Sequence, residues 1–453
     1  MSKHAKAVRT AVLYGILCCT GCAFNTAVPD YLVPLSLALD DPNQAVTGVP
    51  EPISLAGERA DGSTSAIATI TDATLALSDT TSPARSNVLQ EKSSYRELKW
   101  EALPSLIPSA NLRSASSTQG NSANNLNNRE YRLTIQQELL DFGRYASRSA
   151  QAISRIKAAR IEHWQERNQI AHDALVNYTD IARHKALLEL SRDYLATHQG
   201  LLKQIESRLR GGITDRSELA LIQIRVQELQ TQTETDARAQ AATEQLLMSY
   251  TGADLEIQID QLTEAESVAM LPFDFVDSAP SILLAQQEIA LAKAETKETK
   301  SSLFPRLVAE AYVETVDGIQ SEGVGLRLTA NTFAGFSYRS QLSSASLRLE
   351  AAKLGVQRAH RDLNRETNRL NLAYRNLLAR SISLSEQRNQ VRNSVELFLA
   401  QHNSGVKPIL DAIRVYESAL DTERQLVNNQ ADIQLNRLEV ANLLGAIADF
   451  PGI

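Results

Sequence analysis

Cysteine, aromatic residues and long apolar runs are all scarce in this chain of 453 residues, and each shortage excludes a class of protein. All three cysteines, Cys18, Cys19 and Cys22, lie in the first 22 residues, so the rest of the chain has no disulfide and no thiolate metal site. Aromatic residues make up 5% of the chain and hydrophobic residues 43%, which favours long helices with narrow apolar seams over one thick core. The net charge of −7, without a basic stripe, argues against nucleic acid as a partner.

The N-terminus has the pattern of a bacterial export signal. Basic residues precede an apolar segment at 11–19 that is too short to span a bilayer. The sequence "CTGCA" that follows resembles a lipobox, which predicts a signal peptide over 1–21 and a lipid on Cys22. Leucine is usual where Cys19 stands, so an ordinary secretory signal is the alternative. No later run approaches the roughly 18 apolar residues of a membrane helix, so any membrane crossing would need strands.

The chain repeats itself, and the repeats have a nearly constant spacing. Seven identical residue pairs between 82–108 and 279–305 are separated by 197 residues. Further on, the separation becomes 193 residues, which holds for Gly212 with Gly405 and for Gly252 with Gly445. Two constant offsets on either side of one insertion indicate two tandem structural repeats, with the longer loop between Pro108 and about Leu140.

Each repeat has the same predicted order of elements. A helical segment comes first, at 83–103 and at 280–301. A pair of strands follows, at 106–117 with 129–139 and at 304–316 with 323–332, joined by turn-rich loops at 119–128 and 317–323. Long stretches without glycine or proline then predict helices at 144–199, 213–251, 356–404 and 409–444. Such long helices must pack on neighbours, and Leu219, Ile222, Val226 and Leu229 have the spacing of a coiled-coil seam.

The predicted strands alternate between apolar and polar residues. In "YRLTIQQEL" (131–139), Tyr131, Leu133 and Ile135 face one way and Arg132 and Thr134 the other. This alternation suits a half-buried soluble sheet or the wall of a membrane barrel, and the export signal favours the barrel. Four strands cannot close a membrane barrel, because the smallest have eight. The strands would therefore be pooled between two or three chains.

The ordered duplication of strand pair and long helical hairpin, behind an export signal, resembles the TolC-type outer-membrane channel family. The resemblance covers about residues 65–446, and "LLDFGR" (139–144) approximates the family motif where a strand passes into a helix. The first copy of that motif has Leu140, Asp141, Gly143 and Arg144, and the second keeps Phe333 and Gly335 but lacks the aspartate. The implied fold is mainly α with a membrane β-barrel: four strands per protomer form a twelve-stranded trimeric barrel, continued by a periplasmic helical tunnel.

The resemblance also implies a function and partners. The chain would be the outer-membrane component of a tripartite export system, a passive duct extending into the periplasm. An inner-membrane pump, either an ABC exporter or a drug–proton antiporter, would drive it through a periplasmic adaptor protein. The cargo is left open between drugs or other small molecules and type I secreted proteins. The alternative of another class is a lipid-anchored periplasmic coiled-coil scaffold without a pore.

The implied domain boundaries follow the repeats. After the signal peptide we expect an acidic, proline-containing leader at 22–80, extended and partly disordered. The first repeat would span 81–252 and the second 280–446, separated by an equatorial linker at 253–279 and followed by a tail at 447–453.

The hairpin tips are the candidate functional sites. Glu218 and Asp411 each stand six residues after a tip glycine, so a trimer would have six carboxylates near the tunnel mouth, where they would disfavour anions. The alternative is that each acid stabilises the first turn of its helix. The remaining tip residues are candidates for contact with the adaptor or between hairpins: Arg208, Arg210, Gly212, Asp215, Arg216, Gly405, Lys407, Pro408 and Arg414.

No enzyme motif accompanies these features. The sequence has no Gly-x-Ser-x-Gly, no phosphate-binding glycine loop and no His-Glu-x-x-His. His163, His172, His184 and His198 share one predicted helix but lack the spacing of a metal pair, so we expect ordinary helix-face residues there. We therefore predict no catalytic residue, no metal and no cofactor.

Overall fold

The computed structural model describes residues 66–117, 124–212, 214–252, 277–316, 318–330, 335–404 and 407–449. The predicted signal peptide, Cys22 and most of the leader and of the equatorial linker lie outside these residues, as does Gly405. The chain divides into two compact units. The described part of the first unit lies within 88–158 and 286–355, and that of the second within 48–87, 159–285 and 356–449.

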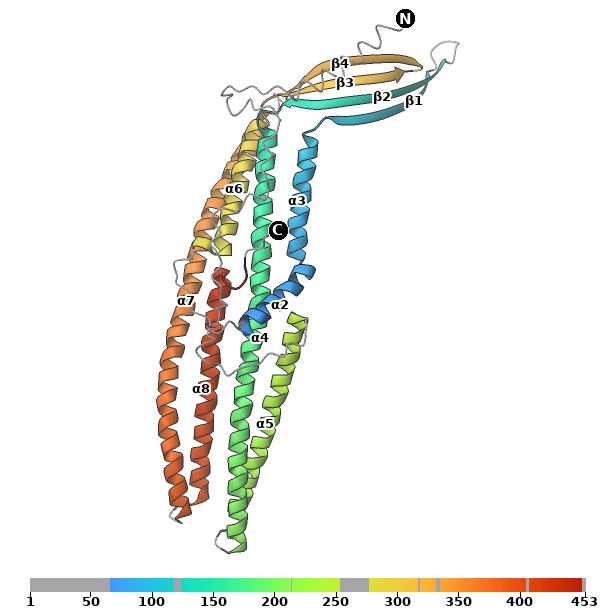
Figure 1. Ribbon diagram of the computed structural model, residues 1–453. Coiled ribbons are helices and arrows are strands. Elements are labelled where there is room, and N and C mark those ends of the chain that lie inside the picture. The colour runs from blue at the N-terminus through green and yellow to red at the C-terminus, as the bar shows by residue number, and fades with distance from the viewer. Residues whose placement is uncertain are drawn as a thin grey trace. The chain divides into compact units, whose positions relative to one another are not determined.

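The elements occur in the same order in both halves of the chain (Figure 1). The first half contains α3 (Pro83–Glu101), β1 (Ser105–Ser117), β2 (Asn124–Leu140), α4 (Arg144–Arg210) and α5 (Arg216–Thr251). The second contains α6 (Pro280–Ser301), β3 (Arg306–Val316), β4 (Ile319–Thr329), α7 (Gly335–Asn403) and α8 (Ile409–Leu444). This order confirms the predicted duplication. None of the described helices is both long enough and apolar enough to cross a membrane.

One helix was not predicted, and two others extend beyond their predicted limits. The segment Ala66–Thr81, expected in the extended leader, is a helix, α2, because Ile70, Thr74 and Leu75 bury one of its faces. Helices α4 and α7 have 67 and 69 residues: α4 continues through Gly200, where the predicted helix ended, and α7 runs through Gly355, after which the predicted helix began. A glycine inside a helix costs only about 1 kcal/mol relative to alanine, which the packing of such long helices can offset.

The first unit contains one antiparallel sheet with the strand order β1-β2-β3-β4. The central β2–β3 pair joins the two repeats, with Leu133 opposite Val313. The loop expected at 317–323 is shorter, because Val316 pairs directly with Ile319 and residues 319–323 belong to β4. Gly318 has φ +85°, and an Asp-Gly pair is the usual sequence of a two-residue hairpin turn.

The second unit is held together by apolar clusters between long helices. Ile70 and Leu75 of α2 join a large cluster with Leu175 of α4 and Leu438 of α8. The predicted seam of α5 is confirmed, since Ile222, Val226 and Leu229 are buried and Leu219 packs against a second cluster. Figure 1 shows α5 beside the C-terminal part of α4, and α8 beside that of α7.

The segment that follows α8 packs onto α4. The indole nitrogen of the buried Trp164 donates a hydrogen bond to the Ala448 carbonyl oxygen at 2.7 Å. The side-chain oxygen of Asn168 accepts from the backbone amides of Ile447 and Ala448 at 2.9 and 3.0 Å. These bonds pair buried backbone groups of the segment after α8, which no longer has helical partners.

Candidate functional site: the sheet and the hairpin tips

One face of the sheet is apolar and exposed. Residues directly opposite one another share a face, so Leu133 and Ile135 of β2 lie on the same side as Val313 and as Leu326 of β4. Leu326 is 68% exposed and Leu133 is 45% exposed. In a water-soluble sheet, this apolar face would be the one covered by the protein's own core. Here the same alternation places leucine, isoleucine and valine on the uncovered side.

The other face carries interacting charges. The Arg132 guanidinium of β2 lies 2.9 Å from a Glu314 carboxylate oxygen of β3 and 3.4 Å from one of Glu130. It also lies over the Tyr312 ring, 5.3 Å from its centroid. On the next strand Arg327 pairs with Glu310. A two-sided sheet with paired charges on one face and bare aliphatic side chains on the other separates an aqueous surface from an apolar one.

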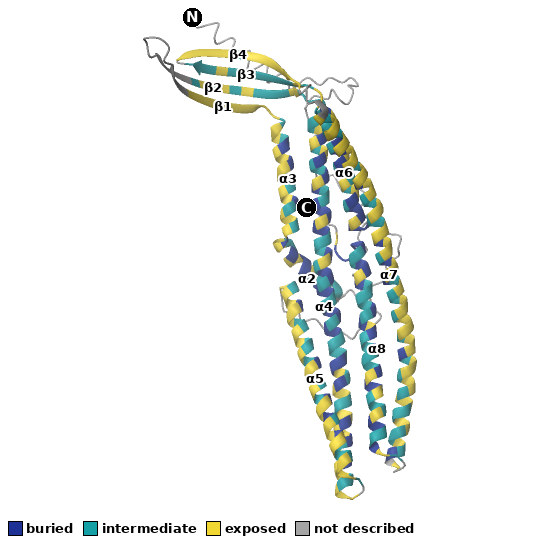
Figure 2. Ribbon diagram, turned by 180° about the vertical axis from the view of Figure 1, so that it is seen from behind, coloured by how far each residue is buried: buried dark blue, intermediate teal, exposed yellow. Residues whose placement is uncertain are grey.

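The sheet also has two free edges. Among the described strands β1 pairs only with β2 and β4 only with β3, so within this part of the chain each outer strand leaves one row of backbone N–H and C=O groups without a strand partner. Figure 2 shows both edge strands as exposed wherever their side chains are described, apart from Gly323 in β4. Unpaired edges invite further strand pairing, and none is tolerated in lipid.

The residues at the predicted strand–helix transition form a tight corner in the first unit. Leu140 ends β2 and pairs with Leu307 after a register shift. The Asp141 carboxylate accepts hydrogen bonds from the backbone amides of Gly143 at 2.9 Å and Tyr145 at 2.5 Å. It thereby satisfies the free amides at the start of α4, as an N-cap residue does. Gly143 has φ +83°, a conformation that favours glycine.

Arg144 connects this corner to the other repeat. Its guanidinium donates to the carbonyl oxygens of Ser301, Ser302 and Phe304, at 3.2, 2.9 and 2.6 Å. The first of these is the last carbonyl of α6, and the other two belong to the segment between α6 and β3. The ring of Phe142 stacks on Phe304 with 5.1 Å between centroids. The motif thus has a structural role here. In the second repeat Phe333 lies outside the described residues, while Gly335 begins α7.

The first hairpin tip, in the second unit, joins α4 to α5. Gly212 has φ +71°, the left-handed conformation expected for a glycine that ends a helix. Asp215 is the N-cap of α5 and accepts from the amides of Ser217 and Glu218 at 2.8 and 3.0 Å. Hydrogen bonds from the Ser217 hydroxyl and the Glu218 amide lower the pKa of Asp215. Glu218 lies in the first turn of α5, and its carboxylate accepts from the Thr214 hydroxyl.

The second tip, joining α7 to α8, begins its outgoing helix in another way. Pro408 is the N-cap of α8, with φ −64° and no side-chain capping bond. Asp411 lies in the first turn of α8. The Lys407 ammonium lies over the Phe398 ring, 3.8 Å from its centroid. Both candidate gate acids therefore occupy first turns, where the helix dipole favours negative charge.

His402, which the sequence did not single out, connects the two tips. Arg208 at the end of α4 lies 2.5 Å from Nε2 of His402 near the end of α7. Nδ1 of the same ring lies 3.2 Å from the Lys407 carbonyl oxygen. Of the other predicted tip residues, Arg210 bonds the Glu206 carbonyl of its own helix, at 3.4 Å. Arg216 and Arg414 are exposed. An apolar cluster lies between the four helices of the tips, α4, α5, α7 and α8. Its buried residues are Leu201, Ile205, Ile222, Ile409, Ala412 and Ile413.

A buried charge network lies on the same hairpins. The Asp236 carboxylate of α5 accepts from Arg424 of α8 at 3.0 Å and from the buried Ser191 hydroxyl of α4 at 2.8 Å. Burial alone would raise the pKa of Asp236, but the hydrogen bonds from Arg424 and Ser191 lower it overall. The network connects three long helices. Because the Asp236–Arg424 pair is largely buried, the cost of removing its charges from water is offset only by the pair itself and its hydrogen bonds.

The α4 histidines do not assemble a metal or catalytic site. Among the described residues, no three histidine, cysteine or acidic side chains are arranged to hold a metal ion. His163 and His198 are fully buried, so they are core residues and not surface residues of the helix face. Nδ1 of His163 lies 3.2 Å from the Ser82 hydroxyl. That hydroxyl is itself buried and donates to Glu166. Ser82, His163 and Glu166 therefore hold the junction between α2 and α3 against α4.

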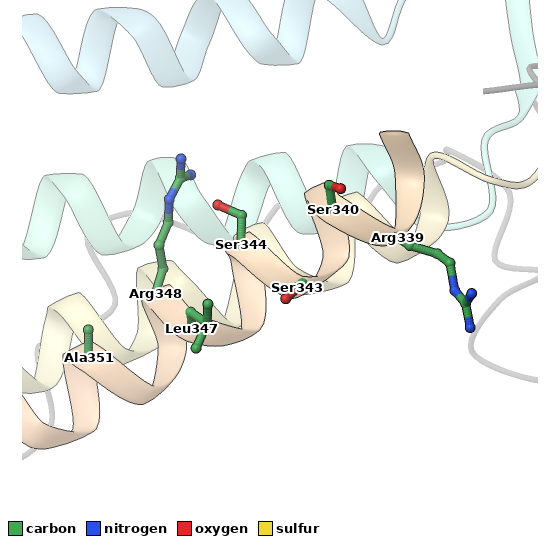
Figure 3. Close-up of a pocket in the computed structure, with 7 residues that line it drawn as sticks. All are labelled: Arg339, Ser340, Ser343, Ser344, Leu347, Arg348 and Ala351. Atoms are coloured by element: carbon green, nitrogen blue, oxygen red, sulfur yellow. The ribbon is translucent and has the colours of Figure 1, made fainter. Parts of the chain in front are cut away.

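A shallow hollow of about 660 Å³ lies along the first turns of α7 (Figure 3). Its lining comprises Arg339, Ser340, Ser343, Ser344, Leu347, Arg348 and Ala351. Arg348 also lies 3.8 Å from a Glu295 carboxylate oxygen of α6. The lining has no carboxylate, cysteine or histidine, so its chemistry is that of a polar helix face and not of a reaction centre.

Comparison with known proteins agrees with this architecture. Residues 273–446 match the family model of outer membrane efflux proteins. A solvent efflux pump outer membrane protein of Pseudomonas putida, SrpC, is 24% identical over 326 residues, which cover 68% of this chain and 69% of that protein. The crystal structure of CusC superposes with a TM-score of 0.77 at 14% identity, covering 87% of this chain and 96% of CusC. The open state of the MtrE outer membrane channel of Neisseria gonorrhoeae gives a TM-score of 0.72 at 17% identity, covering 94% and 100%.

The fold is therefore that of the TolC-type outer-membrane channels. The second repeat matches the outer membrane efflux protein family, and the resemblance seen in the sequence is confirmed. The matched proteins are outer-membrane efflux proteins and not enzymes, in agreement with the prediction of no catalytic activity.

Proposed function

We propose that the chain is the outer-membrane channel of a tripartite export system, a passive duct driven by an inner-membrane pump through a periplasmic adaptor. The observation that carries this proposal is the sheet, whose uncovered face is apolar and whose opposite face has paired charges. Lipid would cover the first face and water the second. A lipid-anchored scaffold without a pore would have no use for that arrangement.

The free edges favour a homotrimer. β1 of one copy and β4 of the next would pair, which satisfies the backbone groups that each sheet leaves open. Three copies of the four-stranded sheet supply twelve strands, and a barrel of that size leaves room for a pore where eight strands would not. This assembly is a head-to-tail interface that closes into a ring.

A matched pair of lysine substitutions on β4 tests the orientation of the sheet. Leu326→Lys places a charge on the exposed apolar face, and Ser321→Lys places one on the polar face, opposite Glu314. A lysine facing the middle of the bilayer costs roughly 2–4 kcal/mol per copy. We expect Leu326→Lys to abolish heat-modifiable trimers in outer-membrane fractions, while Ser321→Lys forms trimers that conduct ions in planar bilayers.

Two outcomes would overturn the proposal. Equal tolerance of both substitutions would mean that neither face lies against lipid. Release of the wild-type chain as a soluble monomer, once any lipid anchor is removed, would instead support the scaffold. The anchor itself is proposed on Cys22, and incorporation of labelled fatty acid into the wild-type chain but not into Cys22→Ser tests it.

For the cargo, we propose small molecules rather than secreted proteins. Support comes from the relatives, which are named as solvent and toluene efflux pump proteins. A strain that lacks this chain should become more sensitive to toluene, and a plasmid copy should restore tolerance. Unchanged tolerance together with the loss of a secreted protein from the medium would assign the duct to type I secretion.

At the periplasmic end, we propose that Glu218 and Asp411 surround the entrance, with the basic tip residues meeting the adaptor. The side chains of both acids are partly exposed in the first turns of α5 and α8. The double change Glu218→Ala and Asp411→Ala should lower the preference for cations, since it removes six negative charges from a trimer. Asp432→Ala with Glu234→Ala, away from the tips, is the matched control. Unchanged selectivity in the tip variant would leave the two acids with a stabilising role only.

A further inference from the structure

We propose that Arg208 and His402 form a pH-sensitive latch between the two hairpin tips of each protomer. The inference rests on the proposed duct, whose entrance the tips would form, and concerns how that entrance is regulated. Arg208 lies 2.5 Å from Nε2 of His402, which is only 6% exposed.

The hydrogen-bond partners determine the state of the imidazole. An arginine guanidinium has donors only, so Nε2 of His402 must accept and cannot carry a proton. Nδ1 faces a carbonyl oxygen, that of Lys407, and so must carry the single proton and donate. The arrangement at the tips therefore requires neutral His402 in one tautomer.

Protonation breaks only one of these two bonds. The Lys407 carbonyl can still accept from Nδ1–H of an imidazolium, so the link within the α7–α8 hairpin remains. Nε2 would gain a proton and a positive charge directly against the Arg208 guanidinium. The bond to α4 would be replaced by repulsion between like charges at the tips themselves. Farther from the tips, the pairs Arg225–Glu417 and Arg424–Asp236 would still join one hairpin to the other.

The surroundings offer the imidazolium little compensation. In the described part of the chain, the His402 ring contacts the Arg208 guanidinium and the Lys407 carbonyl oxygen, and neither partner is a carboxylate. The charged groups on the turns around it are Glu396 of α7, Lys203, Glu206, Arg208 and Arg210 of α4, Lys407 of the connection, Asp215, Arg216 and Glu218 at the start of α5, and Asp411 and Arg414 of α8. Lys407 directs its ammonium to the Phe398 ring, and Glu218 is engaged by Thr214. Histidine is the side chain that most readily exchanges a neutral for a charged form near neutral pH, so acidification is the condition under which the latch would be released.

The test is the conductance of reconstituted trimers at about pH 7.5 and pH 5.5. Wild type should open on acidification, with a change of about tenfold or more in the closed-to-open ratio, as expected for losing one charge-assisted hydrogen bond. His402→Gln should remove this response, because glutamine does not titrate. The matched control is His360→Gln on the same helix, which should keep the response.

Arg208→Glu gives a sharper result, because it should reverse the sign. A glutamate at this position does not repel the neutral imidazole and attracts the imidazolium. The Arg208→Glu channel should therefore close on acidification, and the double variant with His402→Gln should lose that response. A purely structural role for Arg208 would give no such reversal. Conductance with the same pH response in wild type and His402→Gln would overturn the latch but leave the duct intact, whereas no conductance in any variant would overturn the duct itself.

Discussion

Substitution of Gly445, the residue that ends α8, should destabilise the protein far more than substitution of a glycine with the same backbone angles elsewhere. Gly445 has φ +73°, and a Cβ there would lie 2.8 Å from Cζ2 of Trp164 and 2.8 Å from Cγ of Pro280. Neither atom can move freely, because Pro280 is a ring at the start of α6 and the Trp164 indole is held by its bond to Ala448.

Two other glycines separate the contributions. Gly212 has φ +71° with nothing within 4 Å of an added Cβ, so Gly212→Ala measures the backbone effect alone, roughly 1–2 kcal/mol. Gly252 has φ +68°, and its nearest neighbour would be Cδ2 of Leu77 at 3.3 Å, the end of a flexible side chain. Gly445→Ala adds overpacking of about 1–3 kcal/mol to the backbone effect, which gives roughly 2–5 kcal/mol in all.

The assay is chemical denaturation of the detergent-solubilised protein, followed by circular dichroism, for the three alanine variants in parallel. We expect the loss of stability to increase from Gly212→Ala through Gly252→Ala to Gly445→Ala. If Gly445→Ala costs no more than Gly212→Ala, the close packing of Trp164 and Pro280 around the end of α8 does not constrain that position, and the reasoning fails.

Three further outcomes follow from buried contacts and are measured in the same way. Arg424→Met should cost about 3 kcal/mol because it leaves the Asp236 carboxylate buried without its cation, and adding Asp236→Leu should recover most of that loss. Burial lowers the pKa of His163, His184 and His198, so on acidification these histidines take up protons in the unfolded chain at a higher pH than in the folded protein. The free energy of unfolding should therefore be highest above about pH 6.5 and fall as the pH is lowered. The fall should be less steep in His198→Phe, which has one buried histidine fewer. Arg144→Lys should cost about 1–2 kcal/mol, because one ammonium cannot reproduce the guanidinium bonds to Ser301, Ser302 and Phe304, whereas the exposed Arg238→Lys should cost nothing measurable.

Much of the architecture could be predicted from sequence because it follows from periodic patterns. Period-two alternation predicted the faces of β2 and β4, and the absence of glycine and proline predicted the long helices. The limits of those helices were less predictable. Gly200 and Gly355 look like helix ends in a local window, but packing outweighs the small propensity cost. The turn after β3 was placed too broadly, although its Asp-Gly pair was a usable signal.

The contacts at the tips were beyond sequence reasoning for a different reason. Arg208 and His402 are separated by almost two hundred residues and meet only because both hairpins end at the same level of one helical unit. No spacing rule links such a pair. The same holds for Asp236, Ser191 and Arg424, which come from three helices. The transition motif was visible, but its physical role follows only from the folded chain: Asp141 caps α4, and Arg144 bonds carbonyls at and just beyond the end of α6.

The seam between β2 and β3 has a consequence for how such a protein can diversify. Within one chain this seam joins repeat to repeat, and in the proposed ring the pairing of β4 with the next β1 would join them again, so six similar units would alternate around one axis. A ring of six identical chains would have to accept every substitution six times. In the proposed ring each substitution would occur three times, on alternate units, which would allow one tip to use an Asp215 cap and the other a proline and a histidine. Duplication would thus let half of the rim acquire a response to its surroundings while the other half keeps the shape.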